Sequence, residues 1–210
     1  MEFEEMLRGL LDGANIELPD TTLPEPDMVN QWKLIQDRKF YLDYEIDGTI
    51  MGLQRAIFLI NQADKDIAPE ERKPIWIYIM SGGGFIDYTY ALIDLIKLSK
   101  TPVYTVNLGM AGSGAGLIFM SGHKRFSLPT AKVVIHEGST EMKGDATKVL
   151  DAADSYKEDI KYMKNFILSN TQIPKALINK KHANDWTLNT EECLKYSVCD
   201  RIIESLDEVM

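Results

Sequence analysis

The chain has 210 residues, 45% of them hydrophobic, which suits one domain with an extension or two small domains, with enough apolar side chains for a core. Its formal net charge of -9 argues against nucleic acid or an anionic membrane surface as the main partner. Cys193 and Cys199 form no C-x-x-C or Cys/His cluster, so we expect buried thiols in a reducing compartment rather than structural zinc.

The N-terminal part differs in composition from the rest. Residues 1–28 are acidic and contain three prolines, which predicts a flexible extension before a domain at 29–210. Within it, residues 3–11 fit a short amphipathic helix, and the extension reads either as a solvated tail or as a docking element. No basic segment precedes a long apolar run, and no stretch approaches about 18 consecutive apolar residues. We therefore expect a soluble, cytoplasmic protein.

Strands and helices alternate along the next hundred residues. Residues 74–80, PIWIYIM, form an almost continuous apolar run, the pattern of a strand covered on both faces. Two glycine-rich turns follow apolar strands, where α/β sheets bind their ligands. The expected elements are strands at 39–42, 44–46, 74–80, 103–108, 126–128 and 133–136, helices at 50–63, 85–99 and 114–121, and a charged loop at 64–73.

A long helix is expected at 145–169, because apolar residues recur there at alternating spacings of three and four. Two interpretations stay open: a core helix lying on the sheet, or a protruding helix that pairs with another subunit as in a coiled coil. Pro174 marks a break after this helix, and residues 191–196 fit a last short helix. The stripe consists of Ala146, Val149, Ala153, Tyr156, Ile160, Met163 and Ile167.

The turn around Ser113 is the strongest candidate site. A glycine-rich turn connects the strand expected at 103–108 to an apolar helix, and Ser113 lies in this turn between Gly112 and Gly114. A serine at such a turn presents its hydroxyl beside unpaired helical N–H groups, which suit a developing oxyanion. The alternative is a glycine-rich turn in which Ser113 is only a helix N-cap.

A serine nucleophile needs a base, and the base needs an orienting carboxylate. Of the three histidines, His123 and His182 lie in polar turns and read as surface residues, whereas His136 ends an apolar strand. Ser113, His136 and Asp185 supply one group of each kind. The G-x-S-x-G elbow, GxGxxG and P-loop patterns are absent, which disfavours an α/β-hydrolase and nucleotide binding by this chain.

From about Trp32 onward the sequence resembles the Clp protease proteolytic subunit family, ClpP. The matching segments are IMSGGG at 79–84, GMAGSGA at 109–115, KRFSLP at 124–129 with VIH at 134–136, and 185–200. The resemblance implies an α/β fold of the ClpP/crotonase type, a repeated ββα superhelix with a protruding handle helix in a region at about 137–170.

The resemblance also implies roles for particular residues. Ser113 is the expected nucleophile, His136 the general base and Asp185 the orienting carboxylate, with Gly84 and Gly114 supplying the oxyanion-hole amides. It implies a homo-oligomeric tetradecamer, two stacked heptameric rings, in which unfolded polypeptides are hydrolysed. An AAA+ unfoldase that uses ATP would deliver them, and the chain itself is expected to bind no cofactor.

Several positions depart from the family pattern. Gly82 replaces a proline, Gly114 replaces the methionine after the nucleophile, and Glu137 replaces the glutamine after the histidine, while residues 64–73 resemble an insertion. These departures motivate a second hypothesis, an idle ring subunit with a structural or docking role. A third is an acyl-CoA enzyme of the crotonase fold, which the Ser/His/Asp set disfavours.

Overall fold

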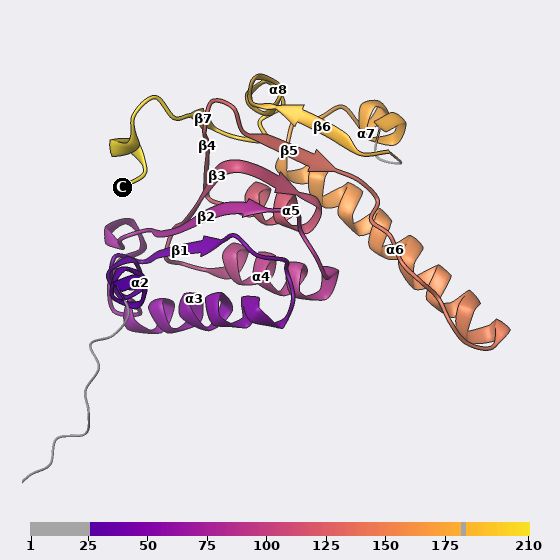
Figure 1. Ribbon diagram of the computed structural model, residues 1–210, viewed down its shortest axis with the longest axis horizontal. Helices are drawn as coiled ribbons and strands as arrows, with labels where there is room; N and C mark the ends of the chain where they lie inside the picture. The colour runs from indigo at the N-terminus through magenta and orange to yellow at the C-terminus, as the bar shows by residue number, and fades with distance from the viewer. Residues whose placement is uncertain (1–25, 182–183) are drawn as a thin grey trace, which may run out of the picture. The chain divides into compact units, whose positions relative to one another are not determined.

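The structure is a computed structural model that describes residues 26–181 and 184–210 (Figure 1). The chain divides into two units, Met1–Leu34 and Ile35–Met210. The described part of the first unit belongs to helix α2 (Pro26–Gln36), where no helix is predicted from the sequence. The amphipathic helix expected at 3–11 lies outside the described residues, and the extension at 1–28 stays a prediction.

The second unit is built on a largely parallel sheet. Its path runs β1 (Lys39–Leu42), β2 (Ile75–Ser81), β3 (Val103–Gly112), β4 (Lys124–Ser127) and β7 (Arg201–Ile202), each parallel to its neighbour. Off this path, β5 (Lys132–Ile135) is parallel to the end of β3, and β6 (Trp186–Asn189) is antiparallel to β5. The predicted α/β class is confirmed.

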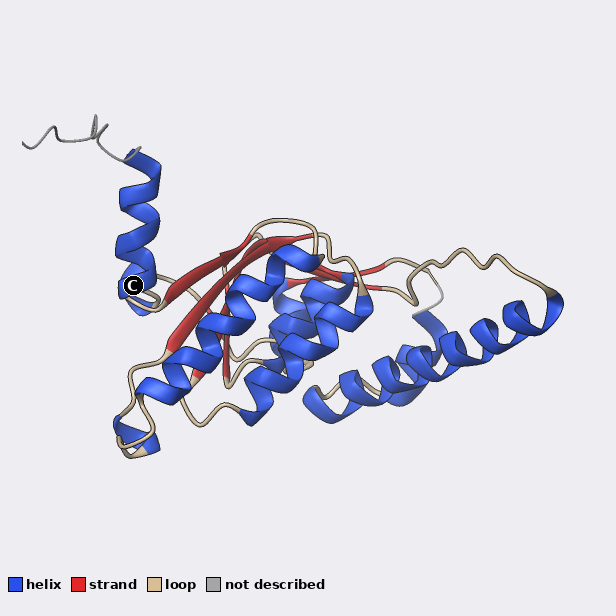
Figure 2. Ribbon diagram, turned by 90° about the horizontal axis from the view of Figure 1, so that it is seen from below, coloured by secondary structure: helices blue, strands red, loops and turns tan. Residues whose placement is uncertain are grey.

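Helices cover one face of this sheet. Figures 1 and 2 show α3 (Met51–Ala63), α4 (Ile86–Leu98) and α5 (Ser113–Ser121) on the same side, each within two residues of its predicted range. The strand expected at 44–46 is reduced to a single bridge between Ile46 and Gly84. The remaining helical elements are α6 (Ala146–Asn170), α7 (Lys175–Lys181), α8 (Thr190–Lys195) and the short 3-10 turns η1 (Gly48–Ile50), η2 (Pro69–Glu71) and η3 (Leu206–Glu208).

Strand β2 shows why the prediction of two covered faces was too simple. Ile75, Ile77 and Ile79 are fully buried in the core beneath the helices. On the opposite face Tyr78 packs with Ile203 and Val209 of the C-terminal segment, while Met80 remains 57% exposed. The second face is therefore covered only in part. Aromatic residues on this face pack largely against one another, and because they are apolar the sequence showed a continuous apolar run instead of an alternation of buried and exposed positions.

The charged segment 64–73 is fastened at its start by a buried ion pair. Asp64 is only 1% exposed, and its two carboxylate oxygens each accept a hydrogen bond of 2.7 Å from Arg38, while the Thr101 hydroxyl donates another at 2.9 Å. The Arg38 hydrogen bonds hold the pKa of Asp64 below its usual value. Segment 64–73 is thus tied to the residue that precedes β1.

Helix α6 packs on the core near its C-terminal end and is exposed near its N-terminal end, while pairing with another subunit stays a prediction. Met163, Phe166 and Ile167 are buried in the core, whereas Leu150, near the other end, is 66% exposed. Figure 1 shows the N-terminal part of α6 extending away from the sheet. Within residues 26–181 and 184–210, none of the helices has the length and apolar character needed to cross a membrane.

Candidate active site

Ser113 occupies a strained turn where β3 passes directly into α5. It is the first residue of α5 and has a φ of 52°, in the left-handed region that non-glycine residues rarely adopt. Gly112 is the N-cap of α5, and no side chain caps the helix there. The interpretation of Ser113 as only a helix N-cap is therefore wrong, and its hydroxyl is available to the cleft beside it.

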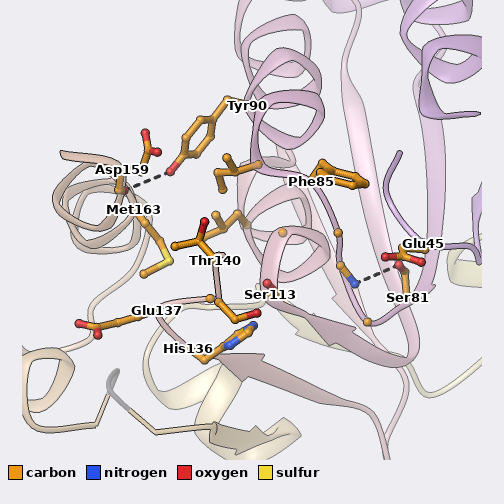
Figure 3. A pocket seen from close by; sticks show the side chains of 18 of the residues that line it. Glu45, Ser81, Phe85, Tyr90, Ser113, His136, Glu137, Thr140, Asp159 and Met163 are labelled. Carbon is orange, nitrogen blue, oxygen red and sulfur yellow. Dashed lines mark hydrogen bonds between the residues drawn. The ribbon is translucent and has the colours of Figure 1, made fainter. Parts of the chain in front are cut away.

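The glycine loop after β2 packs tightly against this turn. A Cβ on Gly83 would lie 2.7 Å from Ser113 Cβ, and one on Gly84 would lie 2.3 Å from Ile46 O. The φ angles of these glycines, 103° and 154°, also disfavour any larger residue. Ser81 Oγ accepts a hydrogen bond from Gly83 N at 3.2 Å, which Figure 3 shows. Close packing and this bond fix the loop beside Ser113.

The two glycines expected to supply oxyanion-hole amides lie in the glycine loop and at the start of α5. Ile46 N donates to Gly83 O, and Phe85 N donates to Ile46 O, both at 2.8 Å. These bonds engage the residues on either side of Gly84, so in this parallel bridge its own N–H points to the opposite side. Gly114 is the second residue of α5, and the first four N–H groups of a helix have no intrahelical acceptor.

Strand pairing brings His136 and Asp185 together. Ile135 of β5 faces Trp186 of β6, so His136 directly after β5 and Asp185 directly before β6 form the next pair. His136 Nδ1 and Asp185 Oδ1 are 3.7 Å apart, which is an ion-pair distance but too long for a hydrogen bond. The side chain of Asp185 is 81% exposed and that of His136 is 30% exposed.

Most of the residues expected in the active site line one cleft of about 980 Å³. Ser113, Gly84, Gly114 and His136 line it, while Asp185 lies outside the lining, behind the imidazole. Figure 3 shows the Ser113 and His136 side chains at this cleft. Among the described residues, no hydrogen bond joins the Ser113 hydroxyl to His136. The structure thus gathers the residues expected to act as nucleophile, base and oxyanion-hole donors, but no hydrogen bond joins the expected nucleophile to the expected base.

Helix α6 forms a wall of the cleft that sequence reasoning did not assign to the site. Tyr156, Ile160 and Met163 line the cavity, and they belong to the apolar stripe whose spacing was visible in the sequence. Tyr156 donates a hydrogen bond of 3.0 Å to Glu137 O, and Lys164 Nζ lies 3.4 Å from Glu137 Oε1. Helix α6 therefore holds the residue that directly follows His136.

The other histidines have different places. His123 follows α5 in an exposed turn, as expected, and its Nδ1 accepts a hydrogen bond of 2.8 Å from Val103 N at the start of β3. Partial burial lowers the pKa of His123. His182 lies outside the described residues. In the part of the chain that the structure describes, His, Cys, Asp and Glu side chains form no group of three or more that could hold a metal ion.

The two cysteines are buried free thiols, as expected, and lie apart from the cleft lining. Burial raises the pKa of Cys193 to about 12 and that of Cys199 to about 11. Both side chains are therefore protonated thiols at neutral pH and serve as packing groups rather than nucleophiles.

Known proteins resemble this chain in sequence and in fold. A proteolytic subunit 2 of the ATP-dependent Clp protease from Treponema pallidum (strain Nichols) is 28% identical over 175 residues, 82% of this chain and 85% of the relative. The subunit of the same name from Borreliella burgdorferi is 30% identical over the same shares of both chains. A ClpP1 mutant from Listeria monocytogenes, 24% identical, superimposes with a TM-score of 0.73 over 86% of this chain and 99% of its own, which supports the fold.

A family-level match extends across nearly all of the second unit. The model of the Clp protease family matches residues 27–206, a range that includes the Ser113 turn, the glycine loop, His136 and Asp185. The sequence and the fold thus indicate the same family. The chain belongs to the Clp protease family, a family of serine proteases.

Proposed function

We propose that this chain is a catalytically active serine endopeptidase subunit that hydrolyses peptide bonds of unfolded polypeptides. The observation that carries the proposal is the placement of Ser113, strained at φ 52° and packed against the glycine loop, in the same cleft as His136. Strain at a serine that does not cap its helix, close to the two glycines expected to supply oxyanion-hole amides, suits a nucleophile and not a structural turn.

In the proposed reaction Ser113 Oγ attacks the carbonyl carbon of the scissile bond while His136 takes its proton. The N–H groups of Gly84 and Gly114 donate to the oxyanion that forms. His136 then gives the proton to the leaving amine, and the C–N bond breaks. Water, deprotonated by His136, hydrolyses the acyl ester and restores Ser113. Asp185 stabilises the imidazolium and holds its tautomer, a contact that shortens when substrate is bound.

We further propose that the chain works inside a chamber of two stacked heptameric rings, fed by an AAA+ unfoldase that consumes ATP. The names of the relatives, proteolytic subunits of ATP-dependent Clp proteases, support the partnership. The exposed N-terminal part of α6 provides a surface for contact between copies. The reaction described above uses side chains and backbone amides only, so we expect this subunit to bind no cofactor.

A second candidate function is an idle ring subunit. The exposed Asp185, 3.7 Å from His136, and the missing hydrogen bond between Ser113 and His136 favour it, because an aligned triad has both contacts. In that case Ser113 would be structurally preserved but unreactive.

Cleavage of a short fluorogenic peptide by wild-type protein and by Ser113→Ala distinguishes the two candidates. We expect Ser113→Ala to lower kcat by about 10³-fold or more, because removal of a serine nucleophile leaves only the binding and oxyanion contributions. Ser155→Ala, at an exposed position of α6, is the matched control and should retain activity. Light scattering should give the same assembly size for all three proteins. A wild-type protein that neither cleaves nor reacts with a fluorophosphonate probe would establish the idle subunit.

A further inference from the structure

The charges that line the cleft are almost all negative. Besides His136, the ionisable residues that line the cleft are aspartates, glutamates and tyrosines. Among the described residues, no lysine or arginine lines it. Glu137 is paired with Lys164, whereas the other carboxylates have no ion-pair partner among the described residues. The acidic lining residues are Asp43, Glu45, Glu137, Glu141 and Asp159.

One end of the cleft combines this charge with an apolar wall. Leu117 of α5 and Ile160 and Met163 of α6 provide the wall, and Asp159, the neighbour of Ile160, places a carboxylate beside it. Figure 3 shows Asp159 and Tyr90 next to each other, with the Tyr90 hydroxyl donating to Asp159 O at 3.4 Å.

Tyr90 lies at the same end of the cleft and is partly buried. Burial, followed by the charge of Asp159, raises the pKa of Tyr90 to about 12. The ring is held in place by an edge contact with Tyr162, with the centroids 4.7 Å apart. An ordered aromatic face beside a carboxylate attracts a cation through both the ring and the charge.

Arginine and lysine side chains match these features. Each has a long apolar stem that can pack along an apolar wall and a cationic head group that can form an ion pair with a carboxylate. A neutral side chain of similar length would bury its stem equally well but would gain nothing from Asp159. An acidic side chain would be repelled.

We propose that this end of the cleft accepts an arginine or lysine side chain of the substrate next to the bond that is cleaved, and that Asp159 determines this specificity. The inference rests on the proposed peptidase function, because it names the substrate class of the same cleft. The apolar wall binds the stem, and Asp159 with Tyr90 binds the head.

Two fluorogenic peptides that differ only in arginine against citrulline test the specificity, since citrulline keeps the length and shape but lacks the charge. At low salt we expect kcat/KM about fivefold higher for arginine, the range of one partly exposed ion pair, and a smaller ratio at high salt. Asp159→Asn should bring the ratio close to one. Asp151→Asn, two turns away on the exposed surface of α6, should keep it. Equal cleavage of both peptides by the wild type, or a ratio that survives in Asp159→Asn, would overturn the inference.

Binding to Ser113→Ala separates this inference from the peptidase function itself. Fluorescence anisotropy with the same two sequences, labelled at the N-terminus, measures the arginine preference without any turnover. Preferential binding of the arginine peptide, together with a wild-type protein that cleaves neither, would refute the peptidase function and leave the cleft's selectivity in place. Cleavage by the wild type without preferential binding of the arginine peptide would support the peptidase function and refute the arginine preference.

Discussion

Two halves of the cleft are built in different ways: the one around Ser113, which we call the nucleophile half after its proposed role, and the one around His136 and Asp185, which we call the acid–base half. Gly83 packs against Ser113 and Gly84 packs against Ile46, so closely that a Cβ added to either glycine would lie 2.7 Å from Ser113 Cβ or 2.3 Å from Ile46 O. His136 and Asp185 lie on partly or largely exposed segments, and their closest approach of 3.7 Å is longer than a hydrogen bond. One half is closely packed and the other is loosely held.

The difference follows from where each half sits in the fold. The nucleophile half joins the ends of β2 and β3, parallel strands with further strands on both sides. The acid–base half joins the ends of β5 and β6, which form an antiparallel pair off the main path of the sheet, and the segment after His136 contacts Tyr156 and Lys164 of α6. Ser113 lies where a central strand meets a buried helix, whereas the segment after His136 contacts a helix that extends away from the core.

The largest expected difference between the two halves is in how much stability each loses when one of its glycines is replaced by alanine. Gly84→Ala places a Cβ 2.3 Å from Ile46 O at a φ of 154°, whereas Gly138→Ala meets only the Tyr156 hydroxyl at 3.5 Å, at a φ of 85°. We expect losses in the free energy of unfolding of about 3 kcal/mol or more for Gly84→Ala and about 1 kcal/mol for Gly138→Ala. Urea unfolding measures both, and equal losses would show that the two halves are equally rigid.

A smaller effect is expected from the carboxylate of the acid–base half. Asp185→Asn should lower kcat by about 10²-fold, less than the roughly 10⁴-fold typical of a buried triad aspartate, because water screens an exposed carboxylate. Asp207→Asn, an exposed position in η3, is the charge-matched control and should leave peptide cleavage unchanged. A loss as large as that of Ser113→Ala would mean that Asp185 is held as firmly as the nucleophile during turnover.

What the sequence predicted well was local. The Ser113 turn was visible because glycines, strand and helix follow one another within twenty residues, and steric rules for glycine act on neighbours in the chain. The alternation of strands and helices from 39 to 135 was visible for the same reason. Asp185, by contrast, entered from the sequence only as a carboxylate that could complete a Ser/His/Asp set, and the family resemblance then assigned it to His136. Strand β6 was not predicted, and the β5–β6 register that pairs these two residues joins segments that are far apart in the chain.

Tertiary packing decided what the sequence could not show. The stripe on α6 indicated an apolar surface, but not that Tyr156, Ile160 and Met163 would line the cleft. Asp159, between the stripe positions, reads as an ordinary surface charge until α4 brings Tyr90 against it. Asp64 was counted in a charged loop, although Arg38, 26 residues earlier, buries it in an ion pair. In each case the deciding partner is distant in sequence, where periodicity carries no information.

The smallest predicted effect concerns the link between α6 and the acid–base half. Lys164→Met removes the ion pair with Glu137, so the segment after His136 becomes less restrained and the base is aligned less often. We expect kcat to fall about threefold with KM unchanged, in line with a partly exposed ion pair. Lys164→Arg should restore the rate, and Lys161→Met, which breaks only the exposed pair with Glu158, should not change it. If Lys164→Met lowered stability but left kcat intact, the ion pair would be structural and His136 would be positioned by the sheet after all.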